Sequence, residues 1–390
     1  MANFDETIDR RGTHSAKWDA MEAVYGVSND DGISMWVADM DFRPPQAVGD
    51  ALQGAVDHGV YGYYAMDGSY RSAVCGWLER RHGWKVDPTW LSTTHGLVAA
   101  VALALQAYTE KGDGIILFTP VYHAFAKMIN NNERQIVESE LVLESGRYEM
   151  DLAALEASLN GTEKMVILCS PHNPGGRVWS VEELRALASF CTRHDLILVS
   201  DEIHHDLVFA PHKHTVMALA APEVSDRLVT LVAASKTFNL AGGMTGSVII
   251  SDEALRAKFA KAHQAAGASP NRFGMLMTEA AYNEGDTWLA ELLDYLTENR
   301  RIFDEGINAI PGLASMSLES TYLAWVDFSG TGMPMADVIE RVQSSARIAA
   351  NYGETFGTGG ENYLRFNLGC PRSVVVKAVQ RLEEAFADLQ

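Results

Sequence analysis

The sequence lacks a long hydrophobic run, a cysteine framework and an excess of basic residues, and each absence excludes a class of protein. The longest apolar run, Leu97 to Leu105, is far shorter than the roughly 20 residues that a membrane-spanning helix needs. The first ten residues are polar and acidic, without the apolar core of a signal peptide. Metal-ligand spacing and the pattern of a secreted disulfide framework are both missing from the four cysteines, which are Cys75, Cys169, Cys191 and Cys370. We therefore predict a cytoplasmic protein with reduced cysteines and no bound metal.

Basic residues are in deficit. The chain has 31 lysines and arginines against 51 aspartates and glutamates, a formal net charge of −20. Nucleic acids and anionic membranes bind basic surfaces, so we expect neither as a partner. An acidic surface favours solubility and is compatible with a local pocket for a small anion. At 390 residues, of which 47% are hydrophobic and 21% charged, the chain has the composition of a globular protein with more than one domain.

Short apolar segments alternate with helical patterns through the middle of the chain. Between two of the segments, Ser180 has the position of a helix N-cap and Glu183 that of its capping-box partner. Five apolar runs are of the kind found in strands covered on both faces, namely 115–118, 165–169, 196–199, 228–232 and 247–250. This alternation predicts an α/β fold with a large, doubly wound, mostly parallel sheet, in which ligands bind beyond the carboxyl ends of the strands.

We expect three regions along the chain. Residues 1–45 are predicted to form an irregular N-terminal arm that belongs to the small domain. Residues 46–285 are predicted to form the large domain, and 286–390 a small α+β C-terminal domain. Longer helical patterns, 287–301 and 373–389, surround an apolar segment in this last region.

Three polar residues follow separate predicted strands. Lys236 is either a solvated loop charge or a buried amine with a lowered pKa that can form a Schiff base. Asp201 is either a helix N-cap or a carboxylate that pairs with a pyridinium nitrogen, and His204 would reach the same side of such a ring. Asn173 lies between two prolines, which is typical of a turn but also holds its amide fixed for hydrogen bonding. Together these residues, in this order, form a specific constellation.

These residues belong to longer motifs. The motifs are Asp9-Arg-Arg-Gly-Thr13, Val37-Ala-Asp-Met-Asp-Phe42, His58-Gly-Val-Tyr-Gly-Tyr63, Thr119-Pro-Val-Tyr-His-Ala-Phe125, Cys169 to Gly176, Ser200-Asp-Glu-Ile-His204, Lys236-Thr-Phe-Asn239 and Arg365-Phe-Asn-Leu-Gly-Cys-Pro-Arg372. Through them the chain resembles, over nearly its whole length, the class I/II aminotransferase superfamily of fold type I, which depends on pyridoxal 5'-phosphate (PLP). Within it, the strings 39–42 and 201–204 resemble the cystathionine β-lyase, or cysteine-S-conjugate β-lyase, branch.

The resemblance implies PLP as the cofactor of the large domain and a role for each matching residue. Lys236 would bind PLP covalently and act as the base, and Asp201 would pair with its ring nitrogen. Arg365, with Asn173, would bind the substrate carboxylate, although a lone arginine on a strand is more often part of a surface ion pair. Tyr63 would reach the active site of a partner subunit in a homodimer. The remaining cofactor contacts would come from Gly96, Leu97, Tyr122, Asn173, His204 and Ser235.

Two positions depart from the resemblance. Many members of the superfamily carry an arginine eight residues after the lysine, where this chain has Met244, and a serine three residues before it, where this chain has Ala233. Phosphate binding would then depend on Ser235, Tyr63 and the backbone N–H groups at the start of a helix at Gly96 and Leu97, a segment for which a plain helix cap is the alternative.

The implied reaction is the C–S β-lyase cleavage of cystathionine or cysteine S-conjugates to a thiol, pyruvate and ammonia. One alternative is a PLP-dependent aminotransferase of an L-amino acid. A further alternative is a PLP-fold protein that is weakly catalytic and serves as a regulatory or binding protein. Formation of pyruvate without an added keto acid separates the first from the other two.

Overall fold

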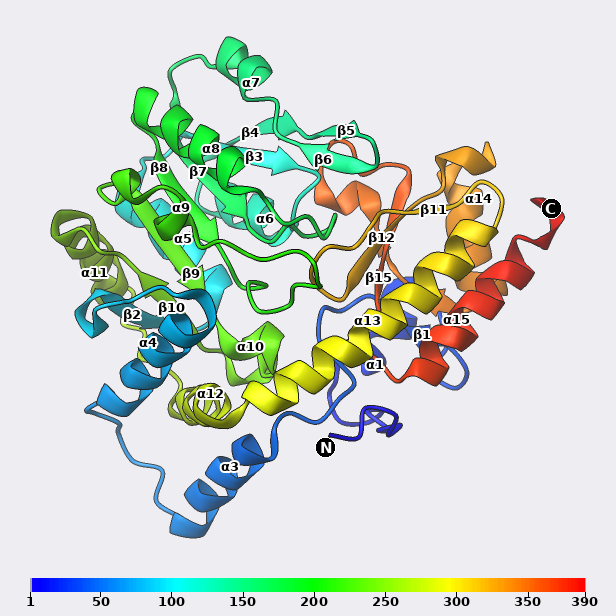
Figure 1. The fold of residues 1–390 in the computed structure, drawn as a ribbon, viewed down its shortest axis with the longest axis horizontal. Coiled ribbons are helices and arrows are strands. Elements are labelled where there is room, and N and C mark those ends of the chain that lie inside the picture. Colours follow the sequence, from blue (N-terminus) through cyan, green and yellow to red (C-terminus); the bar gives the residue numbers. More distant parts are fainter. Residues whose placement is uncertain (1, 390) are drawn as a thin grey trace.

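The computed structural model describes residues 2–389 and contains two main sheets surrounded by helices (Figure 1). The larger sheet has the strand order β2-β10-β9-β8-β7-β3-β4. Neighbours from β9 to β4 are parallel, whereas β10 is antiparallel to both strands beside it. The predicted doubly wound, mostly parallel sheet is therefore confirmed. Its strands are β2 (Leu91–Thr94), β3 (Gly114–Thr119), β4 (Gln135–Glu140), β7 (Glu163–Cys169), β8 (Ile197–Asp201), β9 (Leu228–Val232) and β10 (Gly246–Ile249).

Helices cover both faces of this sheet, which explains the continuous apolar runs. In β3, Ile115 and Leu117 point into a core shared with α5 and α11, whereas Ile116 and Phe118 point into a core shared with α8. A strand buried on both faces has no polar side to alternate with. The helices are α5 (Leu97–Tyr108), α11 (Glu253–Ala265) and α8 (Val181–Arg193), the last with the predicted capping box of Ser180 and Glu183.

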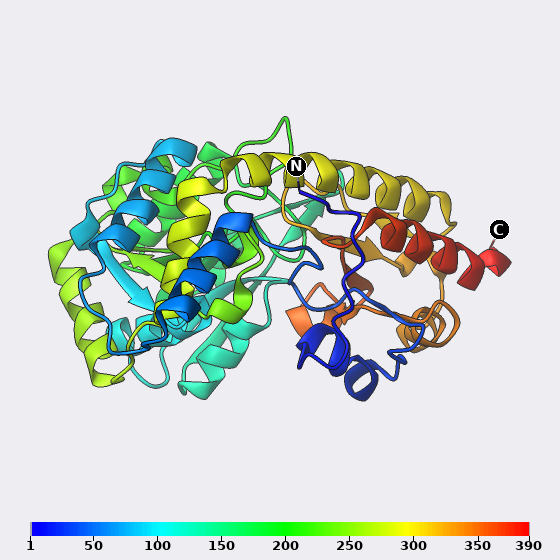
Figure 2. The same cartoon turned by 90° about the horizontal axis from the view of Figure 1, so that it is seen from below.

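The second sheet has the order β11-β12-β15-β14 and is antiparallel. The long helix α13 (Asp286–Ala309) runs from the large sheet along this one and packs against α15 (Arg372–Ala385) (Figure 2). Helix α13 continues eight residues beyond its predicted end at Arg301, because Phe303 and Ile307 extend its buried face. The strands are β11 (Ala314–Ser315), β12 (Leu323–Asp327), β14 (Asn351–Tyr352) and β15 (Tyr363–Asn367).

The N-terminal segment is more ordered than the predicted irregular arm. It contains the short helices α1 (Ala16–Asp19) and α2 (Met21–Tyr25), and β1 (Ile33–Ser34) pairs in parallel with β13 (Ile348–Ala349). Elements of two to five residues carry too little periodicity to be predicted, and this strand exists because it pairs with a segment more than 300 residues away.

Three further helices lie on the side of the large sheet where β2 and β10 form its edge (Figure 1). Helix α12 packs against both α3 and α4, and an extended segment, residues 59–67, joins the last two (Figure 1). Within residues 2–389, none of the helices has the length and apolar character needed to cross a membrane. The bounds are α3 (Gln46–His58), α4 (Gly68–His82) and α12 (Arg272–Glu284).

Candidate active site

The carboxyl ends of β7, β8 and β9 bring the three predicted polar residues to one cavity of about 220 Å³. This position follows from the parallel pairing of the three strands, which places their ends at the same edge of the sheet. Eight of the ten predicted site residues line the cavity, and the other two, Arg365 and Tyr63, do not. The lining residues are Gly96, Leu97, Tyr122, Asn173, Asp201, His204, Ser235 and Lys236.

Lys236 lies in the single helical turn α10 (Ala234–Thr237), directly after β9. Its Nζ donates a hydrogen bond of 2.5 Å to the carbonyl oxygen of Ala38, which comes from the N-terminal segment. Burial, together with the positive charge of Arg365, lowers the pKa of Lys236 to about 8. Its amine is therefore neutral in about a tenth of molecules at pH 7, far more than for a lysine of ordinary pKa, and the neutral form is the one that a nucleophile or base requires. A solvated loop charge would not have this environment.

Asp201 is the last residue of β8 and is 5% exposed. Within residues 2–389, its carboxylate accepts one hydrogen bond, from the backbone N–H of Ile203 at 3.1 Å. The residues after it form turns and not a helix, so Asp201 is not a helix cap. Burial raises its pKa to about 7. A buried carboxylate with so few donors favours a cationic ligand such as a pyridinium nitrogen.

Arg365 lies on β15 of the second sheet and reaches the edge of the cavity through Asn173. Its Nη1 donates to Oδ1 of Asn173 at 3.0 Å, and its Nη2 donates to the carbonyl oxygen of Trp36 and to Oδ1 of Asn351. The side chain is 2% exposed, and no carboxylate of residues 2–389 pairs with it. A surface ion pair, the alternative from the sequence, is therefore excluded. Burial lowers the pKa of Arg365 to about 10, and a buried guanidinium of this kind is suited to bind an anionic substrate group.

Two buried polar atoms at the site have no hydrogen-bond partner in the described part of the chain. They are Nδ1 of His204 and Nε of Arg365. Buried polar atoms are usually paired, so unpaired ones at a cavity indicate groups that a ligand would satisfy. Burial and the charge of Lys236 hold the pKa of His204 well below its ordinary value, so its imidazole is neutral. His204 therefore fits the predicted contact with a cofactor oxygen.

The N-terminus of α5 opens onto the same cavity. Its N-cap is Gly96, with φ of +82°, and a glycine has no side chain to occupy the first N–H groups of the helix. The hydroxyl-bearing residues Ser235 and Thr245 also line this end. Free N–H groups at the start of a twelve-residue helix, with hydroxyls beside them, fit a phosphate group.

One feature of the site was not predicted from the sequence, namely the role of the backbone of residues 36–40. The carbonyl oxygen of Ala38 accepts hydrogen bonds from both Lys236 and the hydroxyl of Tyr322, the latter at 3.0 Å. The carbonyl oxygen of Trp36 accepts from Arg365 at 2.8 Å. This segment therefore links the lysine to the arginine. The motif Asp39-Met-Asp-Phe42 was the only sequence feature that pointed to this segment. Its carbonyl acceptors could not be predicted, because every residue type has a backbone carbonyl.

Tyr63 lies on the extended segment 59–67 and is fully exposed, away from the cavity of its own chain. Its neighbours Val60, Tyr61 and Met66 are exposed as well. The role of Tyr63 in a partner subunit stays a prediction.

Comparison with known proteins agrees with this geometry. The family described as "Aminotransferase class I and II" matches residues 31–382. The chain belongs to this family. It is 39% identical to cystathionine beta-lyase PatB of Bacillus subtilis over 99% of this chain and all of PatB. Among solved structures, a PLP-bound C-S lyase of Staphylococcus hominis in complex with L-cycloserine is 32% identical with a TM-score of 0.92, each chain covered to 98%. A PLP-bound putative aminotransferase of Clostridium difficile is 37% identical with a TM-score of 0.95, over 99% of this chain and all of the other.

One of the two departures from the class I/II pattern that the sequence indicates, Met244, lies at the cavity. Met244 lines the cavity in a left-handed backbone conformation, with φ of +44°, and is 54% exposed. Among the described residues that line the cavity, Lys236 is the only lysine or arginine. The cofactor phosphate would therefore be held in this chain by N–H groups and hydroxyls in place of a guanidinium.

Proposed function

We propose that this protein is a PLP-dependent C–S β-lyase that cleaves cystathionine or cysteine S-conjugates. The observation that carries the proposal is the single cavity at which Lys236, Asp201 and, through Asn173, the buried Arg365 come together. Its family membership and its likeness to proteins named cystathionine beta-lyase and C-S lyase support this reaction. The net reaction on cystathionine consumes one water and gives homocysteine, pyruvate and ammonia.

The residues of the cavity fit PLP by their chemistry. The helix N-terminus at Gly96 suits the phosphate, the underpaired Asp201 suits the ring nitrogen, and the unpaired Nδ1 of His204 suits a ring oxygen. When bound, PLP supplies a conjugated ring that accepts the electron pair left on the substrate α-carbon. Lys236 would hold it covalently.

The chain's own groups perform the remaining tasks. Arg365 binds the α-carboxylate of the amino acid and fixes its orientation. Once the amino group of the substrate has displaced Lys236 from its covalent bond, the freed neutral amine would take the proton from the α-carbon, and its hydrogen bond to Ala38 indicates the direction in which this amine is held. The buried Asp201 keeps a negative charge next to the ring nitrogen, which favours the charge distribution of the deprotonated substrate. Loss of a thiolate from the β-carbon then completes the elimination.

An aminotransferase is the second candidate, because the C. difficile relative carries that name at 37% identity. The two reactions share the removal of the α-proton and differ in the step after it. In a transaminase the proton returns to the cofactor, and a keto acid must regenerate the enzyme. In a β-lyase the C–S bond breaks and no keto acid is consumed.

The test incubates the PLP-loaded protein with cystathionine and no keto acid, and measures pyruvate and free thiol over many turnovers. We expect the two products in equal amounts, with Lys236→Ala as the inactive control. Product formation that requires an added keto acid, or that stops after one turnover, would refute the β-lyase proposal and favour the aminotransferase.

We also propose a cytoplasmic homodimer, with residues 46–285 as the cofactor-binding domain and 1–45 with 286–390 as the small domain. The exposed apolar side chains of the segment 59–67 support the dimer, because such a patch on a free surface costs free energy. The pairing of β1 with β13 supports the assignment of the N-terminal arm to the small domain.

A further inference from the structure

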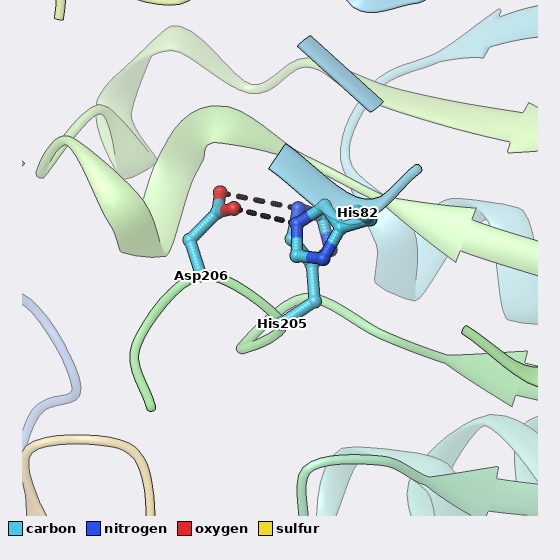
Figure 3. Close-up of side chains that lie close together, drawn as sticks. All are labelled: His82, His205 and Asp206. Atoms are coloured by element: carbon cyan, nitrogen blue, oxygen red, sulfur yellow. Dashed lines mark hydrogen bonds and ion pairs between the residues drawn. The ribbon is translucent and has the colours of Figure 1, made fainter. Parts of the chain in front are cut away.

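Asp206, five residues after Asp201, is the centre of a buried cluster next to the active site (Figure 3). Both of its carboxylate oxygens lie 3.1 Å from Nε1 of Trp77, and Oδ2 accepts a hydrogen bond of 2.8 Å from the hydroxyl of Thr237. Nε2 of His82 lies 2.8 Å from Oδ1, and Nε2 of His205 lies 3.1 Å from Oδ2. We call these five residues the Asp206 cluster.

The two histidines of the cluster favour the ionised form of the Asp206 carboxylate. Burial alone would raise the pKa of Asp206, but His205 and His82 hold it well below its ordinary value. Burial likewise opposes a charge on His205, but the carboxylate outweighs this effect and raises the pKa of His205. Histidine and aspartate side chains are also metal ligands, but both oxygens of Asp206 already lie within hydrogen-bonding distance of side-chain donors of the protein. The bond from Thr237 is therefore charge-assisted and stronger than a neutral one.

The cluster holds the chain directly after Lys236. Helix α10 is four residues long, and its N-cap Ala233 offers no side-chain acceptor, so the helix has little stability of its own. Thr237 is bonded to Asp206, and the ring of Phe238 packs edge-on against Trp77 at 5.4 Å between centroids. The two residues that come after the lysine are thus fixed by the cluster.

The short segment from Asp201 to Asp206 contributes to the positions of both Asp201 and Lys236. Asp201 ends β8 and is buried at the cavity, and Asp206 comes after it within five residues of turns. The hydrogen bond from Thr237 to Asp206 therefore ties the helix of Lys236 to the segment of Asp201. Reacting groups must be held to within a fraction of an ångström, and an exposed, mobile lysine would not satisfy this.

We propose that Asp206 is a positioning residue. Through the hydroxyl of Thr237 it sets the place of α10, and hence of the Lys236 amine, relative to Asp201. Neither Asp206 nor Thr237 lines the cavity, so their effect reaches the cofactor only through Lys236. This role rests on the proposed PLP chemistry.

The decisive pair of variants is Thr237→Val and Thr237→Ser. Valine keeps the shape of threonine and removes the hydroxyl, whereas serine keeps the hydroxyl. Two quantities are measured on the PLP-loaded proteins, namely the midpoint of the pH titration of the bound cofactor's visible absorbance, and kcat and KM for cystathionine. For Thr237→Val we expect the midpoint to move by about half a pH unit or more and kcat to fall about ten-fold, with KM within about two-fold. Thr237→Ser should match the parent protein.

Thermal unfolding of each variant separates positioning from stability. If Thr237→Val equals Thr237→Ser in absorbance midpoint and kcat, whatever its unfolding temperature, the cluster is only structural and the proposal is wrong. Asp206→Asn should change both readouts in the same direction as Thr237→Val and more strongly; if it does not fold, the threonine pair still decides. A parent protein that binds PLP without a covalent visible band overturns the proposed function itself, whereas a normal parent band with identical Thr237 variants overturns the positioning role alone.

Discussion

Replacing Asp201 by asparagine should stabilise the protein without its cofactor, although it harms the site. The carboxylate is buried with one backbone donor, and its pKa rises from 3.8 to about 7. An asparagine of the same shape can still accept the hydrogen bond from Ile203 but carries no charge to desolvate. The variant Asp201→Asn therefore removes an unfavourable group from the folded state.

The size of this effect depends on pH. Because its folded pKa is raised, Asp201 binds more protons in the folded than in the unfolded chain between about pH 4 and 7, and it costs stability as the pH rises through this window. At about 1.4 kcal/mol per pH unit, the cost approaches 4 kcal/mol above pH 7 and is below about 2 kcal/mol at pH 5. The stabilisation by Asp201→Asn should take the same course.

The assay is urea unfolding of cofactor-free protein, monitored by tryptophan fluorescence at pH 5 and at pH 7.5. Asp294→Asn, an exposed carboxylate on α13, serves as the matched control and should change little at either pH. With PLP bound, the parent protein should be more stable to unfolding than Asp201→Asn, since the parent carboxylate then faces a cationic nitrogen. If cofactor-free Asp201→Asn gains no stability between pH 5 and 7.5 relative to the parent, the carboxylate is solvated or already paired, and the electrostatic account of the site fails.

Four further experiments test individual groups of the site. Lys236→Ala should remove the visible absorbance of bound PLP and lower turnover by several orders of magnitude; a borohydride-reduced peptide that maps to another lysine would refute the assignment. Arg365→Met removes the charge that helps to lower the pKa of Lys236, so the pH at which cofactor-free protein captures PLP should move upward from about 8, measured by stopped-flow absorbance. An unchanged pH profile would show that the two charges do not interact. Met244→Arg places a guanidinium at the phosphate end and should lower the Kd for PLP about ten-fold, with Met244→Gln as the neutral control, in a fluorescence titration; equal Kd values would place the phosphate elsewhere. Mixed subunits of Tyr63→Phe and Lys236→Ala should regain partial activity if active sites are shared, whereas no recovery after proven subunit exchange would restrict Tyr63 to its own chain.

The five inner strands of the large sheet were predictable because burial on both faces leaves a local signal, whereas the partly exposed edge strands β2 and β4 lack this signal and were not predicted. Ile115 to Phe118 is apolar at every position, and Ser180 with Glu183 marks the start of α8 through contacts three residues apart. The constellation of Asn173, Asp201 and Lys236 could be predicted for the same reason, since each residue comes after a recognisable strand and parallel strands place their ends together.

The partners of these residues could not be predicted, because they lie far away in the chain. The carbonyl oxygen of Ala38 is 198 positions from Lys236, and any residue type provides a carbonyl. Asp206 meets His82 across 124 positions, and neither residue has a local pattern that distinguishes it from a surface charge. Such contacts arise only when the sheet has brought α4, the segment after β8 and α10 together.

The charges of the site are arranged for a ligand and not for the stability of the free protein. Burial raises the pKa of Asp201, lowers that of Lys236 to about 8 and lowers that of Arg365 to about 10, so all three groups are disfavoured in their charged forms. A buried charge without a partner costs free energy, and the proposed ligands supply a partner for two of these groups: the ring nitrogen for Asp201 and the α-carboxylate for Arg365. The third group, Lys236, would give up its charge when its neutral amine bonds covalently to the cofactor. Cofactor and substrate would therefore relieve a cost that the folded chain already bears. This explains why a substitution such as Asp201→Asn is expected to raise the stability of the cofactor-free protein and to lower the activity of the PLP-loaded one.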